Sequence, residues 1–342
     1  MSFEYVKKIP KPEKILLELP LNKDLVELKK KRDNEIKDVF ENKDDRFLVI
    51  IGPCSADNED AVCDYIARLS KVQDKVKDKL IIIPRIYTNK PRTTGKGYKG
   101  MAHQPDPLEK PNMVEGIKAI RKMHIRAMKE SGLTAADEML YPGNYPYLED
   151  ILSYVAIGAR SVENQQHRLT VSGLDIPIGM KNPISGDINV MINSIIAAQF
   201  GHTFIYNGWE VKTSGNPLVH GILRGALDHQ GRSIPNYHYE DLIEAVRKYL
   251  SKELFNPSII VDTNHSNSDK NFIEQPRIAM EVLYSVKKSD FLKGIVKGMM
   301  IESYLSEGAQ NTTGTIFGKS ITDPCLGWEA SERLLYDIAE RV

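Results

Sequence analysis

The chain has few cysteines, no excess of either charge and no long apolar segment. Its three cysteines are far apart among 342 residues, so we do not expect a disulfide framework. We expect a reducing, cytoplasmic setting instead. Lys plus Arg and Asp plus Glu number 46 each, which argues against a nucleic-acid-binding protein because such domains carry a basic excess. No stretch approaches the ~20 apolar residues of a membrane-spanning helix, and the N-terminus lacks a signal-peptide core. We therefore expect neither nucleic acid nor membrane as a partner.

From residue 46 onward, short apolar runs such as FLVIIG (47–52) alternate with helical patterns. Runs that are apolar throughout are typical of strands buried on both faces, and the alternation predicts a parallel sheet with helical crossovers. A (β/α)₈ barrel needs eight strands and the sequence shows nine runs, so we assign the surplus to a small inserted β excursion near 206–219. A doubly wound sheet is the alternative, but no G-x-G-x-x-G turn follows the first run. We predict an α/β TIM barrel over residues 46–342.

Residues 1–45 do not continue this alternation. The stretch KKIPKPEKILLELPL (7–21) holds three prolines among apolar residues, which favours an extended arm. It is too apolar to stay in water, so we expect the extension 1–45 to pack on another subunit of a homodimer or homotetramer. The run KKKRDNEIKD (29–38) mixes charges of both signs and is typical of a solvated helix face.

Six cationic side chains stand at or just beyond the ends of the predicted strands. In a barrel, functional groups gather at the C-terminal ends of the strands. Six like charges on one face of a neutral protein indicate an anionic ligand with several phosphate or carboxylate groups, since Arg matches both in bidentate fashion. Ion pairing with nearby Asp or Glu explains any single one equally well, but all six together less readily. The six are Arg85, Lys90, Arg92, Arg160, Lys181 and Arg224.

A second group of strand-end residues offers metal ligands. A cysteine packed for its bulk would lie inside an apolar run, whereas Cys54 follows the first run, after Gly52 and Pro53. Sulfur, imidazole and carboxylate donors from four strand ends suit one divalent transition metal ion (Mn²⁺, Fe²⁺, Co²⁺ or Zn²⁺) rather than Ca²⁺ or Mg²⁺. Their spacing matches no short metal motif, so structural roles remain an alternative. The group is Cys54, His265, Glu302 and Asp323.

Several motifs, in their order and spacing, resemble those of the type I alpha 3-deoxy-D-arabino-heptulosonate 7-phosphate (DAHP) synthases. The resemblance runs from about residue 6 to the C-terminus, and KPRTT (90–94) and SITDPCLGWE (320–329) are its most specific motifs. It implies a metal-dependent (β/α)₈ barrel with an N-terminal extension. Such an enzyme condenses phosphoenolpyruvate with erythrose 4-phosphate and releases phosphate, the first step of the shikimate pathway to aromatic amino acids. The other motifs are GPCS, PRIYTNK, AIGAR, GMKN, GILRG, HSNSDK and IESYLSEGAQ.

The resemblance also implies a role for each matching residue. Lys90, Cys54 and His265 are the expected catalytic residues, with Lys90 donating a proton to the new alkoxide; Glu302 or a metal-bound water is the alternative donor. The implied metal ligands are Cys54, His265, Glu302 and Asp323. The implied phosphoenolpyruvate site is Arg85, Lys90, Gly158, Ala159, Arg160, Lys181 and Arg224. The implied erythrose 4-phosphate site is Lys90, Pro91, Arg92 and Thr93.

Three segments depart from the family pattern: NPISGD after Lys181, LYPGNYPY, and ALDHQGRSIPNYH after Arg224. They leave every named residue in place, but they lie near the region where many family members bind an inhibitory aromatic amino acid. The effector (phenylalanine, tyrosine or none) therefore stays open, and we expect the extension 1–45 to form part of its site. Two alternatives to the synthase are a 3-deoxy-octulosonate 8-phosphate synthase, whose loop lacks KPRT, and a non-catalytic barrel that binds an aromatic amino acid.

Overall fold

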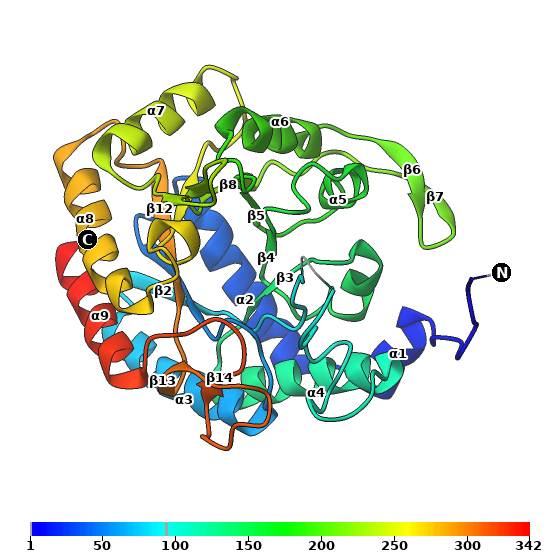
Figure 1. Cartoon of the computed structure of the whole chain (residues 1–342). Coiled ribbons are helices and arrows are strands. Elements are labelled where there is room, and N and C mark those ends of the chain that lie inside the picture. Colours follow the sequence, from blue (N-terminus) through cyan, green and yellow to red (C-terminus); the bar gives the residue numbers. More distant parts are fainter. Residues whose placement is uncertain (1, 93–94) are drawn as a thin grey trace.

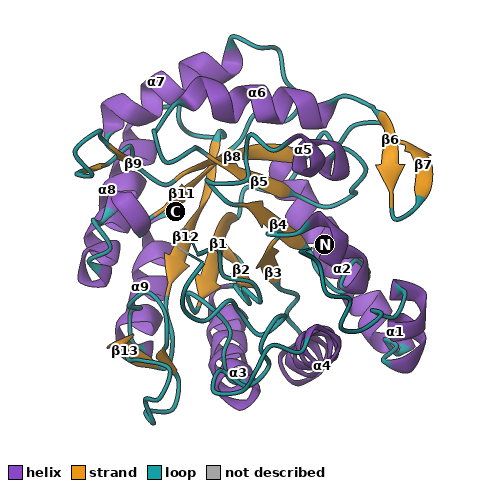
Figure 2. Ribbon diagram, turned by 45° about the vertical axis from the view of Figure 1, so that its right-hand side comes forward, coloured by secondary structure: helices purple, strands orange, loops and turns teal. Residues whose placement is uncertain are grey.

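The computed structural model describes residues 2–92 and 95–342, and its centre is a parallel eight-stranded sheet in the order β2-β1-β12-β11-β8-β5-β4-β3. A parallel bridge joins Arg85, after β2, to Ala136 of β3, and the Ile86 amide donates to the Ala136 carbonyl at 2.9 Å. The sheet therefore closes, and the predicted (β/α)₈ barrel is confirmed (Figure 2). Its strands are β1 (Phe47–Gly52), β2 (Leu80–Pro84), β3 (Ala136–Glu138), β4 (Tyr154–Ile157), β5 (Ile178–Lys181), β8 (Val219–Leu223), β11 (Ile259–Asp262) and β12 (Val296–Glu302).

Helices surround the barrel (Figure 1). Polar caps start several of them; the Asn58 side chain, for example, accepts from the Ala61 amide. Gly132 ends α4 with φ of 69°, because glycine enters the left-handed region without a steric penalty. Among the described residues, no helix combines the length and apolar character needed to cross a bilayer. The surrounding helices are α3 (Glu59–Val76), α4 (Met113–Ser131), α5 (Gln165–Val171), α6 (Ile188–Gln199), α7 (Tyr239–Leu250), α8 (Gln275–Lys288) and α9 (Trp328–Arg341).

Helix α2 (Lys23–Phe40) closes the N-terminal end of the barrel. Its apolar residues Ile36, Val39 and Phe40 are buried in one cluster with strand residues, and the Phe40 ring stacks on His220 of β8 with centroids 4.3 Å apart. Arg32 donates from Nη2 to the Ile82 carbonyl at 2.8 Å. The charged run 29–38 is thus helical as predicted, but one side of it is buried rather than solvated.

The expectation of an extended arm over the N-terminal stretch is wrong beyond residue 11. Pro12 begins α1 (Pro12–Glu18), because a proline in the first helical turn loses no hydrogen bond. Ile15 packs with Tyr147 of the 3₁₀ helix η1 (Pro142–Tyr147). The Tyr147 hydroxyl donates to the Pro10 carbonyl at 2.7 Å. Residues 2–9 project away from the barrel (Figure 1).

The surplus apolar run forms a hairpin outside the barrel, so the predicted β excursion is present but spans 203–212 rather than 206–219. Strands β6 (Thr203–Tyr206) and β7 (Trp209–Lys212) pair antiparallel around Asn207 and Gly208. Both turn residues have positive φ, as two-residue hairpin turns require. The remaining short elements are β9 (Ala226–Leu227), β10 (Ser233–Ile234), η2 (His265–Asn267), η3 (Phe272–Glu274), β13 (Ser306–Ala309) and β14 (Lys319–Ser320).

Candidate active site

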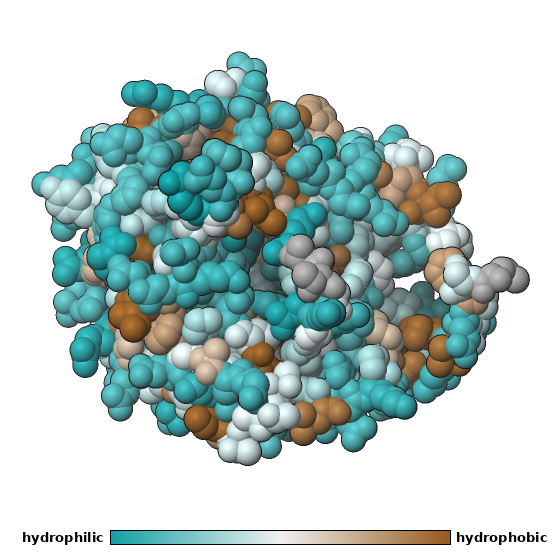
Figure 3. All heavy atoms as spheres, in the orientation of Figure 1, coloured by the Kyte–Doolittle hydropathy of each residue, from teal (hydrophilic) through white to brown (hydrophobic). Residues whose placement is uncertain are grey.

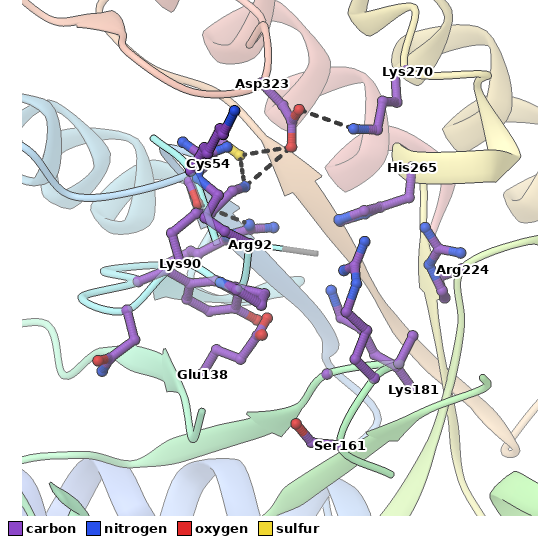
Figure 4. A pocket seen from close by; sticks show the side chains of 18 residues that line it. Cys54, Lys90, Arg92, Glu138, Ser161, Lys181, Arg224, His265, Lys270 and Asp323 are labelled. Carbon is purple, nitrogen blue, oxygen red and sulfur yellow. Dashed lines mark hydrogen bonds and ion pairs between the residues drawn. The ribbon is translucent and has the colours of Figure 1, made fainter. Parts of the chain in front are cut away.

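A pocket of about 280 Å³ opens at the C-terminal ends of the barrel strands (Figure 4). Its wall contains eight Lys or Arg side chains and two carboxylates, so it favours an anionic ligand. The whole face of the molecule in Figure 3 is mainly hydrophilic, with apolar side chains in small groups. The predicted site residues in the wall are Cys54, Arg85, Lys90, Pro91, Arg92, Gly158, Ala159, Arg160, Lys181, Arg224, His265 and Asp323.

Thr93 lies outside the described residues. Of the predicted residues that are described, Glu302 is not in this wall. Glu302, at the end of β12, is only 1% exposed and lies behind the wall, where Arg85 donates from Nη2 to its Oε1 at 2.6 Å. Burial raises the pKa of Glu302, but the charges of Arg85, His265 and Lys90 together outweigh burial, and the net pKa is lowered. Glu302 is therefore an ionised carboxylate at the floor of the site.

Arg85 has two donor nitrogens without an acceptor among the described residues. The side chain is 2% exposed, and its Nη2 is used by Glu302. Nε and Nη1 are buried and point to different sides of the guanidinium, and neither finds an acceptor. Buried donors of this kind are rare because each costs the free energy of its lost hydration. Oxygens of a bound carboxylate or phosphate would supply the missing acceptors.

Arg85, Lys90 and Lys181, three of the predicted cations, form ion pairs with described carboxylates. Arg224, by contrast, donates to a neutral partner, the Ser266 hydroxyl, at 3.3 Å, and burial lowers the pKa of Arg224. Arg92 donates from Nε to the Tyr98 carbonyl at 2.8 Å, which orients the loop that follows β2. The ion pairs are Arg85–Glu302 at 2.6 Å, Lys90–Asp323 at 3.1 Å and Lys181–Asp262 at 3.2 Å.

Three of the four predicted metal ligands converge. One donor atom from each of Cys54, Glu302 and Asp323 lies within 4.8 Å of the other two. Sulfur with two carboxylates fits a divalent transition metal ion by donor chemistry. His265 borders this group, with Nε2 3.8 Å from a Glu302 oxygen, and its Nδ1 lies 2.8 Å from Asp262. A carboxylate behind a histidine is the usual way to orient a metal-binding imidazole.

Lys90 reaches the same donor atoms. Its Nζ lies 2.5 Å from Cys54 Sγ and 3.1 Å from an Asp323 oxygen (Figure 4). Burial, aided by the Glu302 charge, raises the pKa of Cys54 to about 11 although Lys90 opposes this. The free thiol is therefore protonated at neutral pH, and a metal ion that binds Sγ must displace its proton.

The wall also contains residues to which the sequence assigned no role. Glu138 ends β3, and its Oε1 lies 2.6 Å from where a Cβ on Gly158 would stand, so only glycine permits this approach. Lys270 donates to the second Asp323 oxygen at 3.0 Å. Glu138 lies at the end of a predicted strand and Lys270 is the last residue of the HSNSDK motif, so the sequence indicates that both could lie at the site. The residues are Tyr87, Asn89, Lys96, Glu138, Ser161 and Lys270.

Comparison with known proteins gives a consistent answer. The model of the DAHP synthetase I family matches residues 24–336. The chain belongs to this family. A phospho-2-dehydro-3-deoxyheptonate aldolase of Haemophilus influenzae is 36% identical over 99% of this chain and 93% of its own length. The Phe-sensitive phospho-2-dehydro-3-deoxyheptonate aldolase of Escherichia coli K12 is also 36% identical, over 100% of this chain and 97% of its own length.

The fold agrees with the family. The structure of the phospho-2-dehydro-3-deoxyheptonate aldolase from Francisella tularensis superposes with a TM-score of 0.91 at 30% identity, covering 100% of this chain and 98% of that one. The family predicted from the motifs is confirmed, and with it the prediction of an enzyme. The matched family favours a DAHP synthase over an octulosonate synthase.

Proposed function

We propose that this member of the DAHP synthetase I family condenses phosphoenolpyruvate with D-erythrose 4-phosphate and water to give DAHP and inorganic phosphate. The observation that carries the proposal is the pair of buried, unsatisfied donors Nε and Nη1 of Arg85 in a wall of eight cations. Phosphoenolpyruvate bears a carboxylate and a phosphate a few atoms apart, so its oxygens can serve these donors and the neighbouring cations together.

The two substrates would occupy adjoining parts of the pocket. Together they carry about four or five negative charges, and the cations offset their mutual repulsion at the short distance that the reaction needs. Phosphoenolpyruvate would bind Arg85, Lys90, Arg160, Lys181 and Arg224, with backbone contacts at Gly158 and Ala159. Erythrose 4-phosphate would bind Lys90, Pro91, Arg92 and Thr93, of which Thr93 lies outside the described residues.

Cys54, Glu302 and Asp323, together with His265, would hold one divalent ion (Mn²⁺, Fe²⁺, Co²⁺ or Zn²⁺). Bound there, the ion would supply Lewis-acid polarisation of the erythrose 4-phosphate aldehyde. Asp262 would orient His265 through the contact at Nδ1, and Arg85 would hold Glu302 in place.

In the proposed reaction, C3 of phosphoenolpyruvate forms a carbon–carbon bond with C1 of erythrose 4-phosphate. Water adds at C2, and the C2–O bond breaks so that phosphate leaves. Lys90 would donate the proton that the C1 oxygen gains, because its ammonium lies beside Cys54 and Asp323, at the border of both substrate regions. Burial lowers the pKa of Lys90, but Cys54 as a thiolate, Asp323 and Glu302 together outweigh burial and raise the pKa, so the donor stays charged.

We also propose feedback by an aromatic amino acid and assembly through the N-terminal extension. Relatives at 35–36% identity are named Phe-sensitive and Tyr-sensitive, which supports the regulation. Phe3, Tyr5 and Val6 are 82%, 95% and 87% exposed, and such apolar side chains favour contact with another surface. Deleting residues 2–9 leaves the Pro10 carbonyl, which Tyr147 binds. The shortened chain should form a weaker oligomer and lose inhibition but keep its turnover; full inhibition would contradict the proposal.

The proposed reaction is tested by phosphate release from phosphoenolpyruvate on metal-stripped protein, with and without added Mn²⁺. Erythrose 4-phosphate and arabinose 5-phosphate are compared as acceptors, because the second is the five-carbon substrate of the octulosonate alternative. Turnover restored by metal with the four-carbon sugar supports the proposal. Preference for the five-carbon sugar, or no turnover with any divalent metal, would contradict it.

A further inference from the structure

The ring of Tyr87 lies beneath two of the site's cations. Tyr87 follows β2, is 2% exposed and belongs to the pocket wall. The guanidinium carbon of Arg85 is 3.9 Å from its ring centroid, and Lys181 Nζ is 5.9 Å away. Both distances lie within the ~6 Å range of cation–π attraction, which is stronger where water is excluded.

Arg85 is held on two sides and open on a third. Glu302 accepts from Nη2 at one end, and Tyr87 lies against the guanidinium at 3.9 Å. The donors Nε and Nη1 have no acceptor among the described residues. The ring therefore restricts the guanidinium to an orientation in which these donors are available for a ligand.

The aromatic ring, rather than the hydroxyl, makes these contacts. The Tyr87 hydroxyl donates to Met300 Sδ at 3.5 Å, and a thioether sulfur is a weak acceptor. Arg85 and Lys181 are 2% and 3% exposed, so their mutual repulsion is poorly screened by water. The negative face of one shared ring offsets part of this repulsion.

We propose that Tyr87 is a positioning residue for phosphoenolpyruvate recognition: its ring orients Arg85 and helps to hold Lys181 beside it. The inference rests on the proposed function, since it names the residue that prepares the anion site. It assigns Tyr87 no contact with reacting atoms.

The test compares Tyr87→Leu with Tyr87→Phe in the full-length, Mn²⁺-loaded protein. Phosphoenolpyruvate affinity is measured by calorimetry, and KM is measured for each substrate. Tyr87→Phe keeps the ring, so it should bind within about 2-fold of wild type. Tyr87→Leu removes the π face and should weaken binding by about 10-fold. Its KM for phosphoenolpyruvate should rise, whereas its KM for erythrose 4-phosphate should stay near the wild-type value.

Tyr154→Leu is the matched control for lost core packing. Tyr154 is buried in the same apolar cluster, but its hydroxyl pairs with His220 at 2.7 Å. This variant should lose stability and keep its phosphoenolpyruvate affinity. If Tyr87→Leu does not fold, Tyr87→Met, which fills more of the space, takes its place with the same expected result.

Three results would overturn the inference while wild type binds phosphoenolpyruvate, and the first two are wild-type affinity in Tyr87→Leu and equal weakening in Tyr87→Phe and Tyr87→Leu. Equal weakening in Tyr154→Leu would also overturn it, because the effect would then reflect packing alone. Failure of the wild type itself to bind phosphoenolpyruvate would instead contradict the proposed function.

Discussion

The two ends of the barrel use the same eight strands for opposite purposes. At the N-terminal end, Ile36, Val39 and Phe40 of α2 meet strand residues in a buried apolar cluster. At the C-terminal end the strands lead into buried charges, of which Arg85 has two donors without an acceptor among the described residues. Complete packing maximises stability, whereas buried hydrogen-bond donors without acceptors prepare a site for a ligand. Substitutions at the two ends should therefore separate activity from stability.

The largest effect is expected from Glu302→Ala at the C-terminal end. The change removes a proposed metal ligand and leaves the Arg85 charge buried without its partner. Turnover should fall at least ~1000-fold, because metal binding and the orientation of Arg85 are both lost. Loss of one partner of a buried ion pair should also cost about 3 kcal/mol of unfolding free energy.

Phosphate release and urea unfolding measure the two effects. Glu340→Ala, at an exposed carboxylate on α9, should change neither. Wild-type turnover in Glu302→Ala would show that the charges behind the wall take no part in the reaction.

Phe40→Ala tests the opposite end. Phe40 is fully buried against His220, so its truncation should lower the unfolding free energy by about 3–5 kcal/mol. Well below the melting temperature, kcat/KM should stay within about 2-fold of wild type. Phe255→Ala, at a ring that is 66% exposed, is the control and should cost little. A large loss of kcat/KM in folded Phe40→Ala would break the separation between the two ends.

His220 makes the N-terminal end sensitive to acid. Burial lowers its pKa to about 4, although the Leu218 carbonyl bound to Nδ1 opposes this. The folded pKa lies below the unfolded value of about 6.5, so the unfolded chain takes up a proton first as the pH falls. The stabilisation is complete above about pH 6.5 and is lost toward pH 4, at about 1.4 kcal/mol per pH unit.

Urea unfolding at pH 7, 6 and 5 measures this slope. Between pH 6.5 and 5, His220→Gln should lose about 2 kcal/mol less unfolding free energy than wild type. His229→Gln, at an exposed histidine, should keep the wild-type slope. Equal slopes in all three proteins would contradict the account of His220.

The smallest effect is expected from Lys270→Met, which sharpens the comparison within the site. Lys90 and Lys270 hold the two oxygens of Asp323, but their side chains are 11% and 59% exposed. Exposed ion pairs contribute little because water screens them. Lys270→Met should lower kcat/KM by less than ~5-fold, and Lys90→Met by at least ~100-fold. Equal losses would show that Lys270 also acts on the substrates.

The barrel and much of the site follow from rules that need no tertiary detail. Buried parallel strands are apolar throughout, so runs such as 47–52 were recognisable. Because the strand ends of a barrel share one face, Cys54, Arg85 and Lys181 could be placed together before their distances were known.

The errors and omissions depended on local geometry. Pro12 favoured an extended arm but starts a helix. The spacing of Ile36, Val39 and Phe40 marks one helical face, but no pattern in the sequence says that this face covers the barrel. Lys270 reaches the pocket through a turn in which His265, Asp269 and Lys270 all have φ near +50 to +58°, a strained conformation that side-chain periodicity does not report.

The most direct test of the account is phosphate release by Cys54→Ala and Cys63→Ala after metal stripping and Mn²⁺ titration. Both thiols are buried, but Cys54 faces the pocket and Cys63 lies in α3. The account predicts that metal restores turnover with phosphoenolpyruvate and erythrose 4-phosphate in wild type and Cys63→Ala, but not in Cys54→Ala. Full activity in Cys54→Ala, or metal-independent turnover in wild type, would contradict it.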